Sequence, residues 1–172
     1  MPNRSNGFLR VESRSDRAQN GYVLIVDDEP YIRLLISRIV RGQGYPILMA
    51  ADGVGALAQI ARWPIRLIIC NLRMPRMSGP ELYDLLWKIS PAMAGRLVFC
   101  SGDTVSEQSG QFLESSGRPW LAKPFDLDDL VRMVEGQIKS PARLDARAAL
   151  QVSLALARYR EEQARGKLRS QA

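Results

Sequence analysis

The chain of 172 residues contains no histidine and only two cysteines, Cys70 and Cys100. The absence of histidine excludes a Ser-His-Asp triad and acid–base catalysis by an imidazole. The two cysteines stand alone in apolar segments, without the spacing of a zinc site or of a disulfide framework. We therefore expect two small buried thiols and a protein of a reducing compartment, the cytoplasm.

Long apolar segments are missing as well. No run of about 18 apolar residues occurs, so the sequence predicts no membrane span. The N-terminus carries scattered arginines without an apolar core, which argues against a secretory signal. Residues 1–20 are polar and lack periodicity, and we predict that they form a disordered N-terminal arm.

The net charge of +6 belongs to the two ends of the chain. Residues 1–20 hold four basic and two acidic side chains, and residues 140–172 hold seven basic and three acidic ones. Residues 21–139 therefore sum to zero, which argues against a nucleic-acid-binding core. A small nucleic-acid-binding regulator that uses its basic ends remains an alternative, although the sequence has no DNA-reading motif.

Between residues 21 and 139, short apolar segments alternate five times with segments whose apolar residues follow helical spacing. The expected strands are Tyr22–Val26, Tyr45–Ala50, Ile65–Cys70, Leu97–Cys100 and Trp120–Ala122. The expected helices are Pro30–Gly42, Val54–Arg62, Gly79–Ser90, Thr104–Ser116 and Leu127–Lys139. Continuous apolar strands separated by helices predict a doubly wound parallel sheet, covered on both faces.

Polar side chains follow the carboxyl ends of these strands, where α/β sheets place their working site. They are Asp27, Asp28, Asn71, Ser101 and Lys123. Carboxylate and amide oxygens suit a small dication such as Mg²⁺, and a hydroxyl and an ammonium group suit the oxygens of a phosphoryl group. The set therefore favours a site for a phosphoryl group and a magnesium ion.

Four stretches, "VLIVDDEP", "LIICNLRMPRMSG", "LVFCSGD" and "LAKPF", occur in this order on the expected strand ends. Together they resemble the receiver domain of two-component response regulators, over residues 21–139. The resemblance implies a flavodoxin-like (CheY-like) fold with five parallel strands in the order 2-1-3-4-5. It also implies a bacterial signalling module rather than an enzyme, with a histidine kinase or another signalling protein as its partner.

The resemblance assigns a magnesium site to the first and third strand ends. Asp28 matches a direct ligand of the metal, and Asp27 matches an acid that acts through water. The backbone carbonyl of Arg73 falls at the third protein ligand position. Asn71 supplies an amide oxygen where the family has a carboxylate, so we expect magnesium binding to be weak or absent.

The resemblance also implies roles around the phosphoryl group. Ser101 matches the hydroxyl that moves toward the phosphate, and Lys123 matches the lysine that pairs with it. Trp120 lies at the aromatic switch position, and Pro124 matches a proline that follows a cis peptide bond. Gly79 matches the glycine that opens the loop after the third strand.

Asn71 departs from the family, which has at this position the aspartate that accepts phosphate from a histidine kinase. An amide keeps the shape of the carboxylate but does not form an acyl phosphate. We therefore expect no catalytic residue, no phosphorylation at position 71, and a function in protein–protein interaction. The alternative is a phosphoryl-accepting receiver whose aspartate was deliberately changed to asparagine.

Residues 140–172 are predicted to form a C-terminal helical extension that starts near Pro141. Leu144, Ala148, Val152 and Tyr159 lie on one apolar stripe of this helix. Two interpretations are open. The stripe binds a partner, either another protein or a second copy in a homodimer through residues 141–160, or it packs back on the receiver-like domain.

Overall fold

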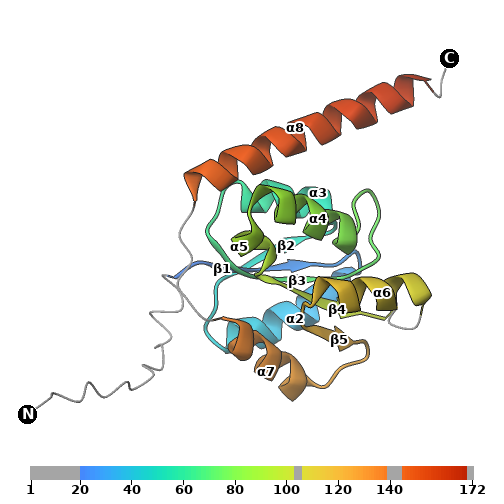
Figure 1. The fold of residues 1–172 in the computed structure, drawn as a ribbon. Coiled ribbons are helices and arrows are strands. Elements are labelled where there is room, and N and C mark those ends of the chain that lie inside the picture. Colours follow the sequence, from blue (N-terminus) through green and yellow to red (C-terminus); the bar gives the residue numbers. More distant parts are fainter. Residues whose placement is uncertain (1–19, 103–105, 139–144, 170–172) are drawn as a thin grey trace, which may run out of the picture.

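The structure is a computed structural model that describes residues 20–102, 106–138 and 145–169. The predicted N-terminal arm and the predicted helix start at Pro141 lie outside these residues, apart from Asn20. In the described part a single sheet is flanked by helices, and a long C-terminal helix lies across one side (Figure 1).

The sheet has five parallel strands in the order β2-β1-β3-β4-β5, which confirms the predicted fold and strand order. The strands are β1 (Tyr22–Val26), β2 (Ile47–Ala50), β3 (Ile65–Cys70), β4 (Leu97–Ser101) and β5 (Trp120–Ala122). Their register aligns the carboxyl ends, because Val26 pairs with Cys70 and Ser101 pairs with Ala122. The residues that follow these strands therefore meet at one edge of the sheet.

Helices cover both faces of the sheet, as the apolar strands predict. They are α2 (Pro30–Gly42), α3 (Gly53–Ile60), α4 (Gly79–Ile89), α5 (Pro91–Ala94), α6 (Glu107–Ser116) and α7 (Leu127–Gln137). The helices α2 and α7 pack on one face, and α3, α4 and α6 pack on the other (Figure 1).

Two apolar cores follow from the alternation of side chains along each strand. One core contains Leu24, Val26, Ile68 and Cys70, and the other contains Val23, Ile25, Leu67 and Ile69. All eight side chains are at most 1% exposed, so both faces of the central strands are buried. This is the burial expected of a parallel sheet between two helical layers.

The observed elements differ from the predicted ones mainly at their ends. Strand β2 begins at Ile47 rather than at Tyr45, since Gly44 turns the chain with a φ of 87° and Pro46 has no N–H to donate. Helix α3 begins one residue early because Asp52 caps it. The short helix α5, which starts with Pro91, was not predicted.

Helix α8 (Ala146–Arg169) packs its first part against α3 and α4 (Figure 1). Val152 and Leu156 are buried there and belong to the same core as the two helices beneath them. Farther along, the hydroxyl of Tyr159 donates a hydrogen bond of 2.6 Å to the carbonyl oxygen of Arg76. The apolar stripe of the extension therefore packs back on its own domain.

The opposite side of α8 faces away from the domain. Leu150 and Leu154 are 59% and 47% exposed there, and every residue from 160 to 166 is exposed. A homodimer through residues 141–160 stays a prediction. Within the described ranges, no helix is both long enough and apolar enough to cross a membrane.

Candidate functional site

The ends of β1 and β3 bring the first candidate residues together. The backbone N–H of Asn71 donates to the carbonyl oxygen of Val26 at 2.8 Å, so Asn71 lies beside the chain that enters Asp27 and Asp28. Asp27 is 1% exposed, whereas Asp28 lies at the surface. Two carboxylates and an amide from segments far apart in the sequence thus share one edge of the sheet.

Lys123 reaches this edge from the end of β5. Its backbone N–H donates to the carbonyl oxygen of Ser101 at 2.8 Å, and its Nζ lies 2.6 Å from Oδ2 of Asp27. The side chains are 12% and 2% exposed, so the ion pair is largely buried. The other oxygen of Asp27 accepts from the N–H of Glu29 at 3.0 Å.

Two charged neighbours of this ion pair were not predicted from the sequence. Oε1 of Glu29 lies 3.6 Å from Nζ of Lys123, and Nη1 of Arg33 donates to the carbonyl oxygen of Asp27 at 2.5 Å. Glu29 follows Asp27 and Asp28 directly, so the run of three acidic residues could have predicted its place beside Lys123. Arg33 lies one helical turn after Glu29, and no sequence motif predicts its contact.

The side-chain amide of Asn71 makes three hydrogen bonds. Its Nδ2 donates to Oδ1 of Asp28 at 3.1 Å and to the carbonyl oxygen of Arg73 at 2.9 Å. Its Oδ1 accepts from the backbone N–H of Leu72 at 2.9 Å. The orientation follows from the partners, because a backbone N–H can only donate while a carboxylate and a carbonyl accept.

This arrangement does not fit the magnesium site that the resemblance implies. We expected the amide oxygen of Asn71 to face a cation, together with Asp28 and the carbonyl of Arg73. The structure instead places the N–H donors of the amide against both of those oxygens. In the described residues, no group of three or more Cys, Asp or Glu side chains is arranged to hold a metal ion.

The loop between β3 and α4 approaches the site closely at Gly79. A Cβ atom at this position would lie 2.5 Å from the carbonyl oxygen of Asn71, so only glycine fits. The next turn is fixed by Ser78 and Glu81, which cap α4 reciprocally. The N–H of Ser78 donates to the Glu81 carboxylate and lowers the pKa of Glu81 below its usual value.

The same loop is tied to the start of α3. Arg76 has a φ of 65° and forms an ion pair with Asp52, which is 2% exposed and accepts from the N–H of Gly55. The side chain of Met77 packs directly over Gly53. Sequence reasoning missed this anchor, and the only signal for it was an aspartate in a helix-capping position.

An open cleft of about 550 Å³ lies over this edge of the sheet. It is lined by Asp28, Glu29, Ile32, Asn71, Arg73, Ser101, Gly102, Lys123 and Pro124. The peptide bond between Lys123 and Pro124 is cis. Trp120 does not line this cleft, and its side chain on the edge strand β5 is 45% exposed. The structure therefore brings together the candidate residues except for Trp120.

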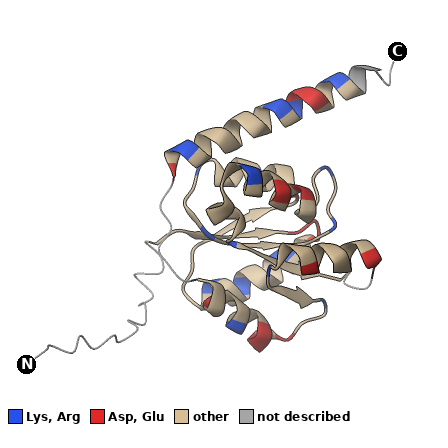
Figure 2. Ribbon diagram, viewed as in Figure 1, with Lys and Arg blue, Asp and Glu red and all other residues tan. Residues whose placement is uncertain are grey.

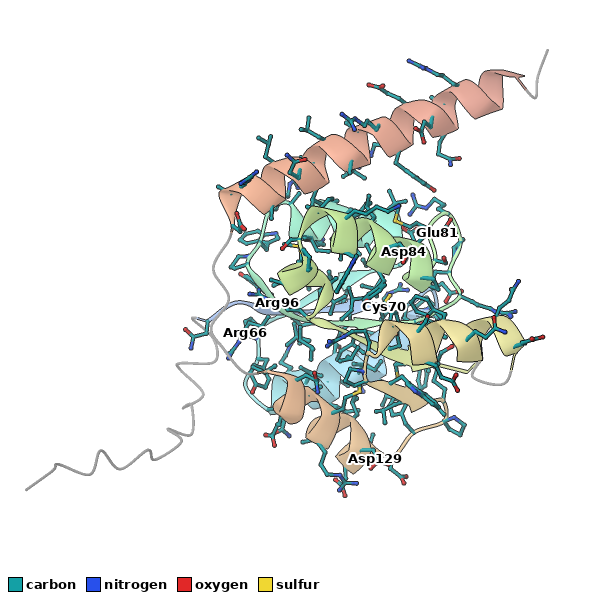
Figure 3. The ribbon with its side chains drawn as sticks, viewed as in Figure 1. Arg66, Cys70, Glu81, Asp84, Arg96 and Asp129 are labelled. Carbon is teal, nitrogen blue, oxygen red and sulfur yellow. The ribbon has the colours of Figure 1, made fainter. Side chains whose placement is uncertain are left out.

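The two cysteines supply no reactive group near the cleft. Cys70 lies inside the molecule between the helical layers (Figure 3), and burial raises the pKa of its thiol far above its usual value. Burial also raises the pKa of Cys100 to about 12. Both groups remain thiols at neutral pH, and neither supplies the thiolate that nucleophilic catalysis needs.

Comparison with known proteins points to one family. A family model described as the response regulator receiver domain matches residues 23–135. The chain is similar to the transcriptional regulatory protein KdpE of Mycobacterium tuberculosis, with 28% identity over 117 residues, 68% of this chain and 50% of that protein. It is also similar to the nitrogen assimilation regulatory protein NtrX of Azorhizobium caulinodans, with 33% identity over 69% of this chain and 26% of that protein.

Solved structures give the same result. The chemotaxis protein CheY4 of Vibrio cholerae has 29% identity and a TM-score of 0.60, over 67% of this chain and 97% of that one. A CheY-like receiver domain protein from Methanospirillum hungatei has 26% identity and a TM-score of 0.61, over 68% and 92%. The chain spans about half or less of the length of the curated relatives named above.

Proposed function

The chain belongs to the response regulator receiver family, and from this premise we propose that it is a signalling module that accepts no phosphoryl group at Asn71 and acts through contacts with other proteins. One observation carries the proposal. The residue at the end of β3 is an amide whose nitrogen is bound to Asp28 and to the carbonyl of Arg73. An amide in this position has no negative oxygen to attack phosphorus.

Ser101 and Lys123, which also line the cleft, do not replace the missing nucleophile. Ser101 is 2% exposed at the end of β4. The ammonium group of Lys123 is held by Asp27 at 2.6 Å, and an ammonium nitrogen has no lone pair with which to attack phosphorus. Neither of these two side chains is therefore an activated acceptor.

Binding to a protein needs none of this chemistry. Receiver domains interact with histidine kinases and with other signalling proteins. A domain with the same shape but without a phosphoryl acceptor can bind to such a partner without taking a phosphoryl group from it. Helix α8 carries more basic than acidic residues, and its two acidic residues lie between basic ones (Figure 2), so its exposed second half offers charges of both signs for contacts with a protein partner.

Intact mass spectrometry after incubation with acetyl phosphate and Mg²⁺ tests the proposal. The protein is expected to gain no phosphoryl adduct, whereas the Asn71→Asp variant restores a carboxylate nucleophile and is expected to gain one. A phosphoryl adduct on the unchanged protein would contradict the proposal. An adduct on the variant alone would also show that the rest of the cleft still supports the transfer.

A further inference from the structure

Two acceptor oxygens from different loops converge on a single nitrogen in the cleft. Asp28 lies after β1 and Arg73 lies after β3. Oδ1 of Asp28 and the carbonyl oxygen of Arg73 nevertheless both lie within 3.1 Å of Nδ2 of Asn71. An asparagine amide has two N–H groups, and both are used here. The amide therefore joins the segments that follow β1 and β3, at the carboxyl ends of the strands where the cleft lies.

Asn71 holds this position with its whole side chain. The oxygen of the amide accepts from the N–H of Leu72 at 2.9 Å. If the amide turned over, its oxygen would face two acceptors and its nitrogen would face a donor, so all three hydrogen bonds would be lost. Because Asn71 is only 7% exposed, solvent offers little replacement for them.

A divalent cation would need the same place. Mg²⁺ binds oxygen ligands at about 2.0–2.1 Å, and to contact both Asp28 and the carbonyl of Arg73 it would have to displace the nitrogen between them. The N–H groups also present positive hydrogens to any incoming cation. Entry of a metal therefore costs at least the two hydrogen bonds that Nδ2 donates.

The charges around the cleft reduce the need for a cation. Asp27 is neutralised by Lys123 at 2.6 Å, and its carbonyl oxygen is bound by Arg33. Asn71 adds no negative charge to Asp28, whereas an aspartate at position 71 would place a second carboxylate beside it. Like charges held this close disfavour each other strongly unless a cation lies between them.

We propose that the amide of Asn71 takes the place of a divalent cation, so that the cleft is complete and stable without metal. The inference rests on the proposed function in one respect, namely that the protein acts with an asparagine, and not an aspartate, at position 71. It goes further in stating how the site is held together. The hydrogen bonds that join the ends of β1 and β3 come from the chain itself and do not depend on the supply of magnesium.

Thermal unfolding with and without metal tests the inference. The melting temperature of the protein is expected to differ by less than about 1 °C between EDTA and about 10 mM MgCl₂, because a ligand stabilises only a state that it binds. Asn71→Asp is expected to melt several degrees lower in EDTA and to recover in MgCl₂. The double variant Asn71→Asp, Asp28→Asn is the matched control and is expected to lose most of that recovery.

Paramagnetic Mn²⁺ provides a second measurement that needs no variant. In a ¹⁵N-labelled sample of the unchanged protein, the side-chain N–H signals of Asn71 and the backbone signal of Leu72 are expected to keep their intensity when Mn²⁺ is added. Loss of these signals at low Mn²⁺ concentration, or a rise in melting temperature with Mg²⁺, would overturn the inference. Either result leaves the absence of phosphorylation untouched, since the mass measurement decides that separately.

Discussion

Lys123, which lines the cleft, forms a largely buried ion pair with Asp27. Asp27 is 1% exposed, so its carboxylate has little access to water if its partner is lost. Breaking a buried pair by removing one partner leaves an uncompensated charge. Lys123 therefore contributes to stability less through its attraction to Asp27 than by preventing an uncompensated buried charge on that residue.

Replacement of this lysine tests the point. Lys123→Met is expected to lower the free energy of unfolding by about 3 kcal/mol, because Asp27 then stays buried without its partner. Lys88→Met, at an exposed position on α4, is the matched control and is expected to change it by less than about 0.5 kcal/mol. Urea denaturation measures both values, and equal losses in the two variants would contradict the argument.

At the scale of residues, the sequence predicts which groups meet but not how they are bonded. The convergence of Asp27, Asn71, Ser101 and Lys123 follows from strand ends in a parallel sheet. The orientation of the Asn71 amide does not, because it depends on the N–H of Leu72 and on two acceptors from other segments. Hydrogen-bond partners of this kind are fixed only by the register of strands far apart in the chain.

At the scale of elements, helix α8 has two unlike sides. Leu156 is 7% exposed and belongs to the core over α3 and α4, whereas Leu154 on the other side is 47% exposed. The buried Ala148 and Ala149 have small side chains, which let the helix approach its neighbours closely. The two leucines therefore allow one substitution to be compared on both sides of the same helix.

Leu156→Ala is expected to lower the free energy of unfolding by about 2–4 kcal/mol, since it removes buried methyl groups and leaves a cavity. Leu154→Ala, with the same loss of side chain at an exposed position, is expected to cost less than about 0.5 kcal/mol. Chemical denaturation compares the two. If Leu154→Ala proved the more damaging and also changed the mass in solution, the outer side of α8 would be an interface between copies of the chain.

The elements also show where sequence reasoning stops. The buried strands were predicted within two residues at each end, because an apolar run of that length has few other structures available. The destination of α8 was left open, since an apolar stripe fits a second protein and the chain's own domain equally well. Only the packing of Val152 and Leu156 over α3 and α4 decides between these two interpretations of the stripe.

At the scale of the whole molecule, the two thiols report on global stability. Cys70 and Cys100 are at most 1% exposed, and burial raises the pKa of both. Because only a thiolate reacts readily, the native protein offers neither a reactive form nor access to it. Both cysteines lie on central strands, which open only when most of the domain unfolds.

A thiol reagent is therefore expected to modify neither cysteine in the native protein at about pH 8, where a free thiol with its ordinary pKa near 8.5 reacts readily. Both are expected to react in denaturant, and the urea dependence of the rate should follow the unfolding curve. Absorbance of the released thiol product measures the reaction. Rapid modification of either cysteine without denaturant would mean that β3 or β4 opens locally.

Helix α8 also has a mechanical consequence. A helix of 24 residues is about 36 Å long, and its last buried contacts lie near Leu156 and Tyr159. Near the end of these contacts, the hydroxyl of Tyr159 donates a hydrogen bond to the carbonyl oxygen of Arg76. Displacement of α8 at Tyr159 is thus expected to move the loop that carries Arg76 and Arg73 and that leads back to Asn71.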